Sequence, residues 1–299
     1  MKAYNLQMTS SPHVEQNLAF IETELERLSA EVSESLVVLP ECFACFGGKE
    51  KANVEISEPR WALNQSFEDD IESNLATPVQ IKLSQLAHKY KIYLVAGTFP
   101  IQVIHTKNSA CVDRVKPMSL VYAPNGQLIS CYQKIHLFDV DVNDNTGSYR
   151  ESDTWQAGEE VSYFDTPWGR VGLAICYDVR FPALFQKLAE LGCKAIVLPS
   201  AFTQKTGQAH WQVLIQARAI ENQVYMIACD QTGIHKNNRQ TFGHSIVVSP
   251  WGDVLSNADN GLGLFGADMD LEVLQNLRSA MPLQQHNQFS VNLKSRKVD

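Results

Sequence analysis

The sequence has no apolar run long enough to cross a membrane and no cluster of Lys and Arg residues. A transmembrane helix needs about 20 consecutive apolar residues, and binding to nucleic acid or to an anionic membrane needs concentrated positive charge. The formal net charge of -8 opposes such binding. The chain opens on the polar stretch AYNLQMTS and not on a basic and apolar leader. We therefore expect a cytoplasmic protein that binds neither membranes nor nucleic acid.

A disulfide framework and a metal motif are also missing. The seven cysteines are odd in number and scattered along the chain, unlike those of a small secreted protein. Cys42 and Cys45 form a C-x-x-C pair, but no second pair and no H-x-x-x-H accompanies it. We expect reduced thiols and no metal.

Two further cofactor patterns are incomplete. GLGLFG at 261–266 fits the dinucleotide expression G-x-G-x-x-G, but a short strand and a C-terminal helix follow it, not a βαβ unit. DVDVND at 139–144 begins like a calcium loop, but Asp144 stands where the required Gly belongs and Arg150 where the bidentate Glu belongs. We expect no cofactor.

The most informative stretch that is present runs from Arg170 to Pro182. Bulky and small residues alternate up to Cys176, which is typical of a strand. A helix should begin at Pro182 and end at Gly192, and a buried strand follows at 194–202. The two strands should be parallel, with Cys176 at the carboxyl end of the first, where open α/β sheets place ligands. Cys176 is thus a candidate nucleophile, although a free cysteine is more often a small buried hydrophobe.

Hydrophobic periodicity predicts the other elements. Helices are expected over residues 13–29, 79–90, 208–222 and 271–280. Strands are expected over 4–8, 35–43, 92–98 and 224–230, and hairpins over 119–130, over 164–172 and around 250–252. The tail from about Met281 should be extended.

Two pairs of similar sequence segments indicate a repeated architecture. VLPECF at 38–43 resembles VLPSAF at 197–202, and VYAPNGQLIS at 121–130 resembles VVSPWGDVLS at 247–256, in the same order. Two similar halves, each with helices and a mixed sheet, pack most simply as two sheets face to face with helices outside. We predict an α/β fold, a four-layer αββα sandwich with pseudo-two-fold halves, and a single domain over 1–299.

Three residues with reactive side chains lie at or beside strand ends: Glu41, Lys134 and Cys176. An acid, a cation and a thiol are what acyl transfer from an amide requires, because the thiol must lose its proton and the tetrahedral intermediate needs positive donors. Each also has a structural interpretation, as a solvated loop carboxylate, a surface lysine and a packed thiol.

The segments around these residues resemble the nitrilase superfamily of carbon-nitrogen hydrolases. PECF, YQKIHLFD and LAICYDVRFP are similar to that family's three catalytic segments, in the right order. The resemblance implies the αββα sandwich, a Glu-Lys-Cys set, no metal, and homodimers or larger homo-oligomers. It also implies a second carboxylate, which falls on Glu151. In the mechanism that we expect from this set, the backbone N–H of Tyr177 joins Lys134 in holding the oxyanion.

The second half of the chain is most similar to the deaminated glutathione amidase branch. The resemblance implies hydrolysis of deaminated glutathione to α-ketoglutarate and cysteinylglycine. An ω-amidase acting on α-ketoglutaramate, an N-carbamoyl amidohydrolase and a binding sandwich with an inert thiol remain as alternatives. The small-molecule substrate should meet a polar or cationic pocket, for which the candidate lining residues are Arg180, Phe202, His210 and Arg239.

Overall fold

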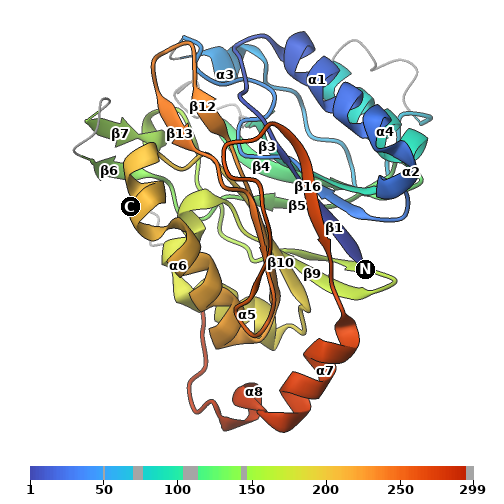
Figure 1. Cartoon of the computed structure of the whole chain (residues 1–299). Helices are drawn as coiled ribbons and strands as arrows, with labels where there is room; N and C mark the ends of the chain where they lie inside the picture. The colour runs from blue at the N-terminus through green and yellow to red at the C-terminus, as the bar shows by residue number, and fades with distance from the viewer. Residues whose placement is uncertain (50, 70–76, 104–113, 143–146, 294–299) are drawn as a thin grey trace.

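Two six-stranded sheets packed face to face form the centre of the molecule, as seen in a computed structural model of the chain (Figure 1). The structure describes residues 1–49, 51–69, 77–103, 114–142 and 147–293. The first sheet has the strand order β16-β1-β2-β3-β4-β5. Its strands are β1 (Lys2–Gln7), β2 (Leu36–Val38), β3 (Tyr93–Gln102), β4 (Val115–Tyr122), β5 (Leu128–Gln133) and β16 (Gly263–Asp268).

The second sheet repeats the first, strand for strand. Its order is β8-β9-β10-β11-β14-β15 when read from the equivalent edge. In each sheet the second, third and fourth strands run parallel and the remaining pairs are antiparallel. The predicted pseudo-symmetric halves are confirmed. The strands are β8 (Tyr163–Thr166), β9 (Gly169–Leu173), β10 (Ala195–Ser200), β11 (Tyr225–Asp230), β14 (Ile246–Val248) and β15 (Val254–Asn257).

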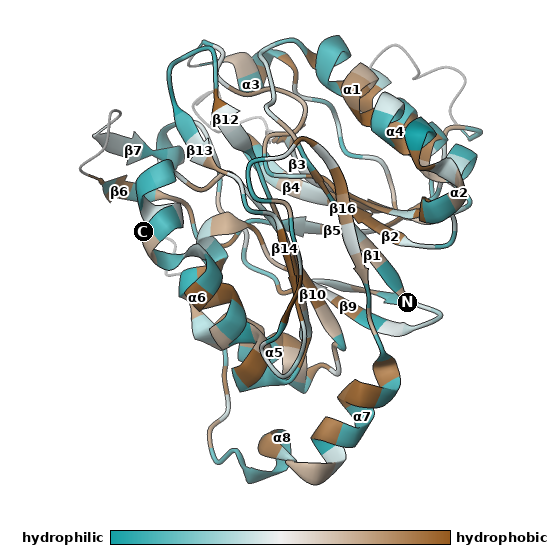
Figure 2. Cartoon of the chain, viewed as in Figure 1, coloured by the Kyte–Doolittle hydropathy of each residue, from teal (hydrophilic) through white to brown (hydrophobic). Residues whose placement is uncertain are grey.

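Helices form the two outer layers. Helices α1 (Val14–Arg27) and α4 (Pro78–Tyr90) cover the first sheet, and α5 (Pro182–Glu190) and α6 (Gln204–Asn222) cover the second (Figure 1). Successive side chains of β2 point to opposite faces of the first sheet. Val37 packs in the core under α1 and α4, whereas Leu36 and Val38 pack in the core between the sheets. Apolar residues accordingly concentrate on the inner strands (Figure 2). The predicted αββα sandwich is confirmed.

Several boundaries differ from the sequence-based expectations for local reasons. Helix α6 begins four residues early because the Thr203 side chain accepts from the Thr206 N–H at 3.3 Å and caps it. Strand β2 ends at Val38, shortly before Pro40, which has no N–H to donate to a neighbouring strand. Helix α7 (Leu271–Ala280) has the predicted bounds, and Gly192, at φ 87°, follows α5 as predicted. The tail differs, since it contains a one-turn helix, α8 (Leu283–His286).

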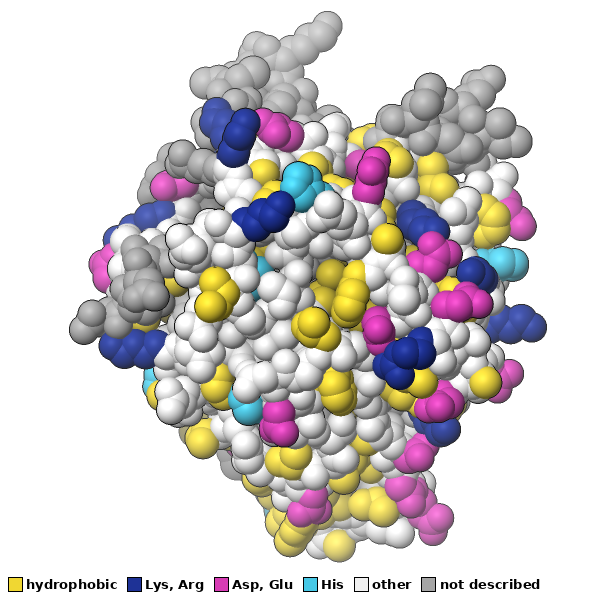
Figure 3. All heavy atoms as spheres, turned by 45° about the horizontal axis from the view of Figure 1, so that its top comes forward, with side chains coloured by type: hydrophobic (Ala, Val, Ile, Leu, Met, Phe, Trp, Pro, Cys, Tyr) yellow, Lys and Arg dark blue, Asp and Glu magenta, His cyan; other side chains and the backbone are white. Residues whose placement is uncertain are grey.

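The remaining elements are short and lie between the strands. They are α2 (Ser29–Val32), α3 (Ala52–Glu55), the hairpins β6–β7 (Asp139–Asp141, Ser148–Arg150) and β12–β13 (Thr232–Ile234, Gln240–Phe242), and the 3₁₀ turns η1 (Glu151–Asp153) and η2 (Cys176–Arg180). In the described ranges, every helix is too short or too polar to cross a bilayer. Acidic and basic side chains are interspersed on the face seen in Figure 3.

Candidate active site

A buried ammonium held between two carboxylates forms the centre of the site. Lys134 follows β5 directly, and its side chain is 1% exposed. Its Nζ lies 2.7 Å from Oε1 of Glu41 and 3.0 and 2.9 Å from Oε1 and Oε2 of Glu151. The fold thus brings together three of the sequence-predicted residues, two of them 93 positions apart.

Burial alone would lower the pKa of Lys134, but Glu151 and Glu41 outweigh it and hold that pKa well above its usual value. Lys134 is therefore an ammonium throughout the physiological range. Glu151 is held by a further contact, because its Oε2 also accepts from the Phe138 N–H at 2.8 Å. The cation and both carboxylates are fixed relative to one another before any substrate arrives.

Glu41 is positioned by the segment that follows β2. The Glu41 carbonyl accepts from the Gln231 side chain at 3.0 Å, and the N–H of the next residue, Cys42, donates to Thr98 at 2.8 Å. This segment runs against β3 so closely that a Cβ on Gly97 would lie 1.8 Å from the Pro40 carbonyl oxygen. Only glycine fits at that point, and its φ of 24° also lies in the region that glycine favours.

Cys176 begins η2 with a φ of 43°, which is rare for a residue with a side chain. The turn is braced by Asp178, which is fully buried. Its Oδ2 accepts from the Ile175 N–H and from the Tyr132 hydroxyl, both at 2.8 Å. Its Oδ1 accepts from the His136 N–H at 3.2 Å and lies 2.7 Å from the Nδ1 of the same ring. Asp178 therefore fixes the backbone that presents the thiol.

The environment of Cys176 keeps its thiol protonated. Burial raises the pKa of Cys176 well above its usual value, and the charge of Glu41 raises it further. Lys134 and a hydrogen bond from the Ala201 backbone N–H act in the opposite direction without reversing the shift. A thiol in this state is a weak nucleophile until a base takes its proton.

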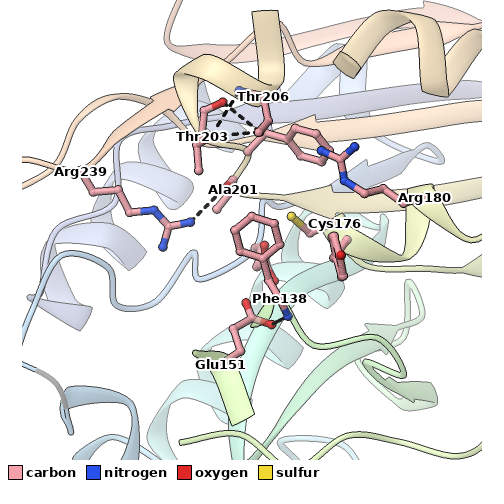
Figure 4. A pocket seen from close by; sticks show the side chains of 11 residues that line it. Phe138, Glu151, Cys176, Arg180, Ala201, Thr203, Thr206 and Arg239 are labelled. Carbon is pink, nitrogen blue, oxygen red and sulfur yellow. Dashed lines mark hydrogen bonds between the residues drawn. The ribbon is translucent and has the colours of Figure 1, made fainter. Parts of the chain in front are cut away.

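A pocket opens over Cys176 (Figure 4). Glu41, Glu151, Cys176 and Tyr177 lie on its wall, as do three of the four predicted lining residues, Arg180, Phe202 and Arg239. The other wall residues are Phe138, Ala201, Thr203 and Thr206.

His210 stands apart from this wall. It lies on α6 and contacts Arg180, with 3.2 Å between its Nδ1 and Nη1 of the arginine. Of the residues that the structure describes, no three His, Cys, Asp or Glu side chains are grouped so that they could hold a metal ion.

Sequence reasoning missed Asp178 and the backbone of Ala201. Asp178 belongs to the quoted segment LAICYDVRFP, and its position three residues after Ile175 suits a carboxylate that closes a turn. Ala201 contributes only its main chain, so its side chain gives no signal.

Comparison with known proteins shows the family of the chain. A carbon-nitrogen hydrolase family model matches residues 5–279. The chain belongs to the carbon-nitrogen hydrolase family. Its sequence is 36% identical over 294 residues to a deaminated glutathione amidase from Yersinia enterocolitica, covering 98% of this chain and 95% of that protein. It is also 37% identical over 283 residues to an omega-amidase from Saccharomyces cerevisiae, covering 94% and 91%.

The crystal structure of Saccharomyces cerevisiae Nit3, a member of branch 10 of the nitrilase superfamily, has the same fold. It matches with a TM-score of 0.80 and 34% sequence identity over 97% of each chain. The resemblance to the nitrilase superfamily drawn from three short segments is thus confirmed.

Proposed function

We propose that this carbon-nitrogen hydrolase is an amidase that cleaves a small-molecule amide through a thioester on Cys176. The observation that carries the proposal is the buried Lys134 held between Glu41 and Glu151, two carboxylates that share the wall of one pocket with Cys176. A binding sandwich with an inert thiol would not need a buried lysine between two carboxylates, since burying charges is expensive. The family match to carbon-nitrogen hydrolases supports the same conclusion.

The first half-reaction begins when Glu41 accepts the Cys176 proton and the thiolate attacks the amide carbonyl carbon. This proton transfer leaves the net charge of the site unchanged, because a carboxylate is neutralised as a thiolate forms. The carbonyl π electrons move to oxygen, and the oxyanion is held by the Lys134 ammonium and the Tyr177 backbone N–H. The carbon–nitrogen bond then breaks, the departing amine takes the proton from Glu41, and a thioester remains.

The second half-reaction repeats these roles with water. Glu41 removes a proton from the water that attacks the thioester, and the same donors hold the second oxyanion. The carbon–sulfur bond then breaks, the acid is released, and the proton on Glu41 returns to Cys176. Glu151 takes no proton in this scheme; it orients Lys134 by its two contacts at 3.0 and 2.9 Å.

We propose deaminated glutathione as the substrate, with α-ketoglutarate and cysteinylglycine as products. The Yersinia enterocolitica relative carries that activity in its name, and Arg180 and Arg239 on the pocket wall are suited to carboxylates. An ω-amidase acting on α-ketoglutaramate is the second candidate, supported by the Saccharomyces cerevisiae relative. The two substrates share their acyl half and differ in the leaving amine.

The deciding experiment compares hydrolysis of the two amides by the purified enzyme, with release of α-ketoglutarate as the readout and Cys176→Ala as the blank. A preference for deaminated glutathione that vanishes in the blank supports the proposal. A preference for α-ketoglutaramate assigns the protein to the second candidate with the same mechanism. Activity that survives in Cys176→Ala would refute the assignment of the nucleophile.

We also propose that the protein is cytoplasmic, forms one domain over its length, and assembles as a homodimer or larger homo-oligomer. All six cysteines that the structure describes are free thiols, which suits a reducing compartment. Val213 and Ile220 expose apolar side chains on the outer face of α6 and are candidates for the contact between copies. Sedimentation of the wild type and of Val213→Asp tests this assembly: a monomeric wild type would contradict it.

A further inference from the structure

Two arginines point into the pocket from opposite sides of Cys176 (Figure 4). Arg180 comes from η2, and Arg239 comes from the loop of the β12–β13 hairpin. Arg180 contacts His210 and Arg239 donates to the Ala201 carbonyl. Across the described residues, neither guanidinium forms an ion pair with a carboxylate. Two guanidinium groups without internal counterions suit a ligand with an anion at each end.

Arg239 is held in place before a ligand binds. Its Nη2 donates to the Ala201 carbonyl at 3.2 Å, and its guanidinium carbon lies 4.8 Å from the ring centre of Phe46 and 4.9 Å from that of Tyr149. The hairpin is anchored by buried His235, whose Nδ1 lies 3.0 Å from the Ser10 carbonyl oxygen and whose Nε2 lies 2.8 Å from the Thr241 hydroxyl. Arg239 is therefore a preorganised donor.

The Arg239 side chain also carries an unused donor. Its Nε is buried and has no hydrogen-bond partner among the described residues. Buried donors in folded proteins are nearly always paired. Because Arg239 lines the pocket, a ligand bound there is a candidate partner for this donor. The pairing expected of a guanidinium with such a donor is a carboxylate.

The neighbours of each arginine indicate which half of the substrate it meets. Phe46, under Arg239, belongs to the segment that follows Glu41, and Arg239 also acts electrostatically on Cys42, the residue next to Glu41. Arg180 instead lies over Tyr177 and Phe202, on the other side of the pocket. Glu41 protonates the departing amine in the proposed mechanism, so the leaving group should lie on the side of Arg239.

We propose that Arg239 binds an anion carried by the leaving amine and so selects amides that release an anionic amine, such as a peptide with a free C-terminal carboxylate. The inference rests on the proposed function and sharpens it. Cysteinylglycine ends in such a carboxylate, whereas ammonia from α-ketoglutaramate carries none. A dipeptide spans at most about 7 Å, so its carboxylate lies no farther than about that distance from the nitrogen that leaves.

The test compares deaminated glutathione with its glycine carboxamide, which has the same scissile bond and a neutral leaving group. Wild type should favour the free carboxylate in kcat/KM by about 10- to 100-fold, the range expected for a charged hydrogen bond. In Arg239→Gln this ratio should fall to near 1, mainly through a higher KM for the free acid. Arg239→Lys should keep part of the preference, since it keeps the charge without the planar group.

Lys236→Gln is the matched control, because it removes one positive charge from the same hairpin at a side chain that contacts His13 and not the pocket. Its preference should equal that of wild type. Equal turnover of acid and carboxamide by wild type, or an unchanged ratio in a folded Arg239→Gln, would overturn the role of Arg239 and leave the proposed function standing. A wild type that does not hydrolyse deaminated glutathione would refute the proposed substrate, and this inference with it.

Discussion

Replacing Lys134 by methionine would leave the carboxylates of Glu41 and Glu151 facing each other without their cation. The side chain of Glu41 is 7% exposed and that of Glu151 is 26% exposed. Removing one partner of a buried ion pair lowers the free energy of unfolding by about 3 to 5 kcal/mol. Because Glu151 is partly solvated, the effect at this site should be near the lower value. We therefore expect Lys134→Met to lower the free energy of unfolding by about 3 kcal/mol at pH 7.5.

The loss of stability in Lys134→Met should be greater at high pH than at low pH. Without the ammonium, burial and mutual repulsion should favour a proton held between the two carboxylates of the folded variant. The folded variant then binds more protons than its unfolded chain, so its stability falls as pH rises. Lys134→Met should be less destabilised at pH 5 than at pH 7.5.

Urea unfolding at the two pH values measures both quantities, and the double variant Lys134→Met/Glu151→Gln provides the control. Removing one of the two carboxylates should return most of the lost stability at pH 7.5. Amide hydrolysis should remain at least about 10²-fold below wild type in both variants, because the proposed oxyanion donor is absent. A Lys134→Met protein as stable as wild type at pH 7.5, or one that Glu151→Gln does not relieve, would refute the electrostatic argument.

Three further predictions follow from the supports of the site. Gly97→Ala should give little soluble folded protein, measured by expression and circular dichroism, because its Cβ would lie 1.8 Å from the Pro40 carbonyl oxygen; normal folding would contradict the stated close approach. Asp178→Asn should lower the free energy of unfolding by about 3 kcal/mol in urea, since one amide oxygen cannot replace a carboxylate that makes four contacts. The same substitution should lower kcat, and a wild-type kcat would exclude Asp178 as a positioning residue. Burial raises the pKa of Asp230 well above its usual value, so the stability that its protonated form contributes declines as pH rises. Between pH 5 and pH 8 the free energy of unfolding of Asp230→Asn should therefore fall less than that of wild type. Parallel plots of unfolding free energy against pH would contradict the shift.

The parts of the fold that the sequence predicted are those that depend on neighbours along the chain. The unit from β9 through α5 to β10 depends on alternation, on Pro182 and on Gly192, all within one short stretch, and its strands pair in parallel as expected. The repeat was visible because equivalent strands kept similar residues. The conformation of Cys176 was not predictable, because its positive φ is imposed by the buried Asp178 and not preferred by cysteine.

The candidate site was predicted unevenly for a related reason. The segments that resemble the family pointed to Glu41, Lys134 and Cys176 as candidates, but nothing in their spacing requires contact between residues 93 positions apart. His210 was expected on the pocket wall, but it lies one turn of α6 beyond Thr206 and only contacts Arg180, which does line the pocket. The unpaired donor on Arg239 could be found only once its surroundings were known.

The charges of the site explain why its thiol can rest in the neutral form. A free thiolate at Cys176 would add a negative charge beside Glu41 and Glu151. The single ammonium of Lys134 would then have to balance three negative charges. Transfer of the thiol proton to Glu41 avoids the extra negative charge, because it neutralises one carboxylate. The thiolate should therefore form only as the proton moves, and the resting enzyme should hold a neutral thiol. Alkylation of Cys176 by neutral iodoacetamide should therefore be slow at pH 7 and should become slower still in Glu41→Gln, where the base is lost. If Glu41 acted only by repelling the thiolate, the same substitution would speed alkylation, so the direction of the change distinguishes the base from the repelling charge.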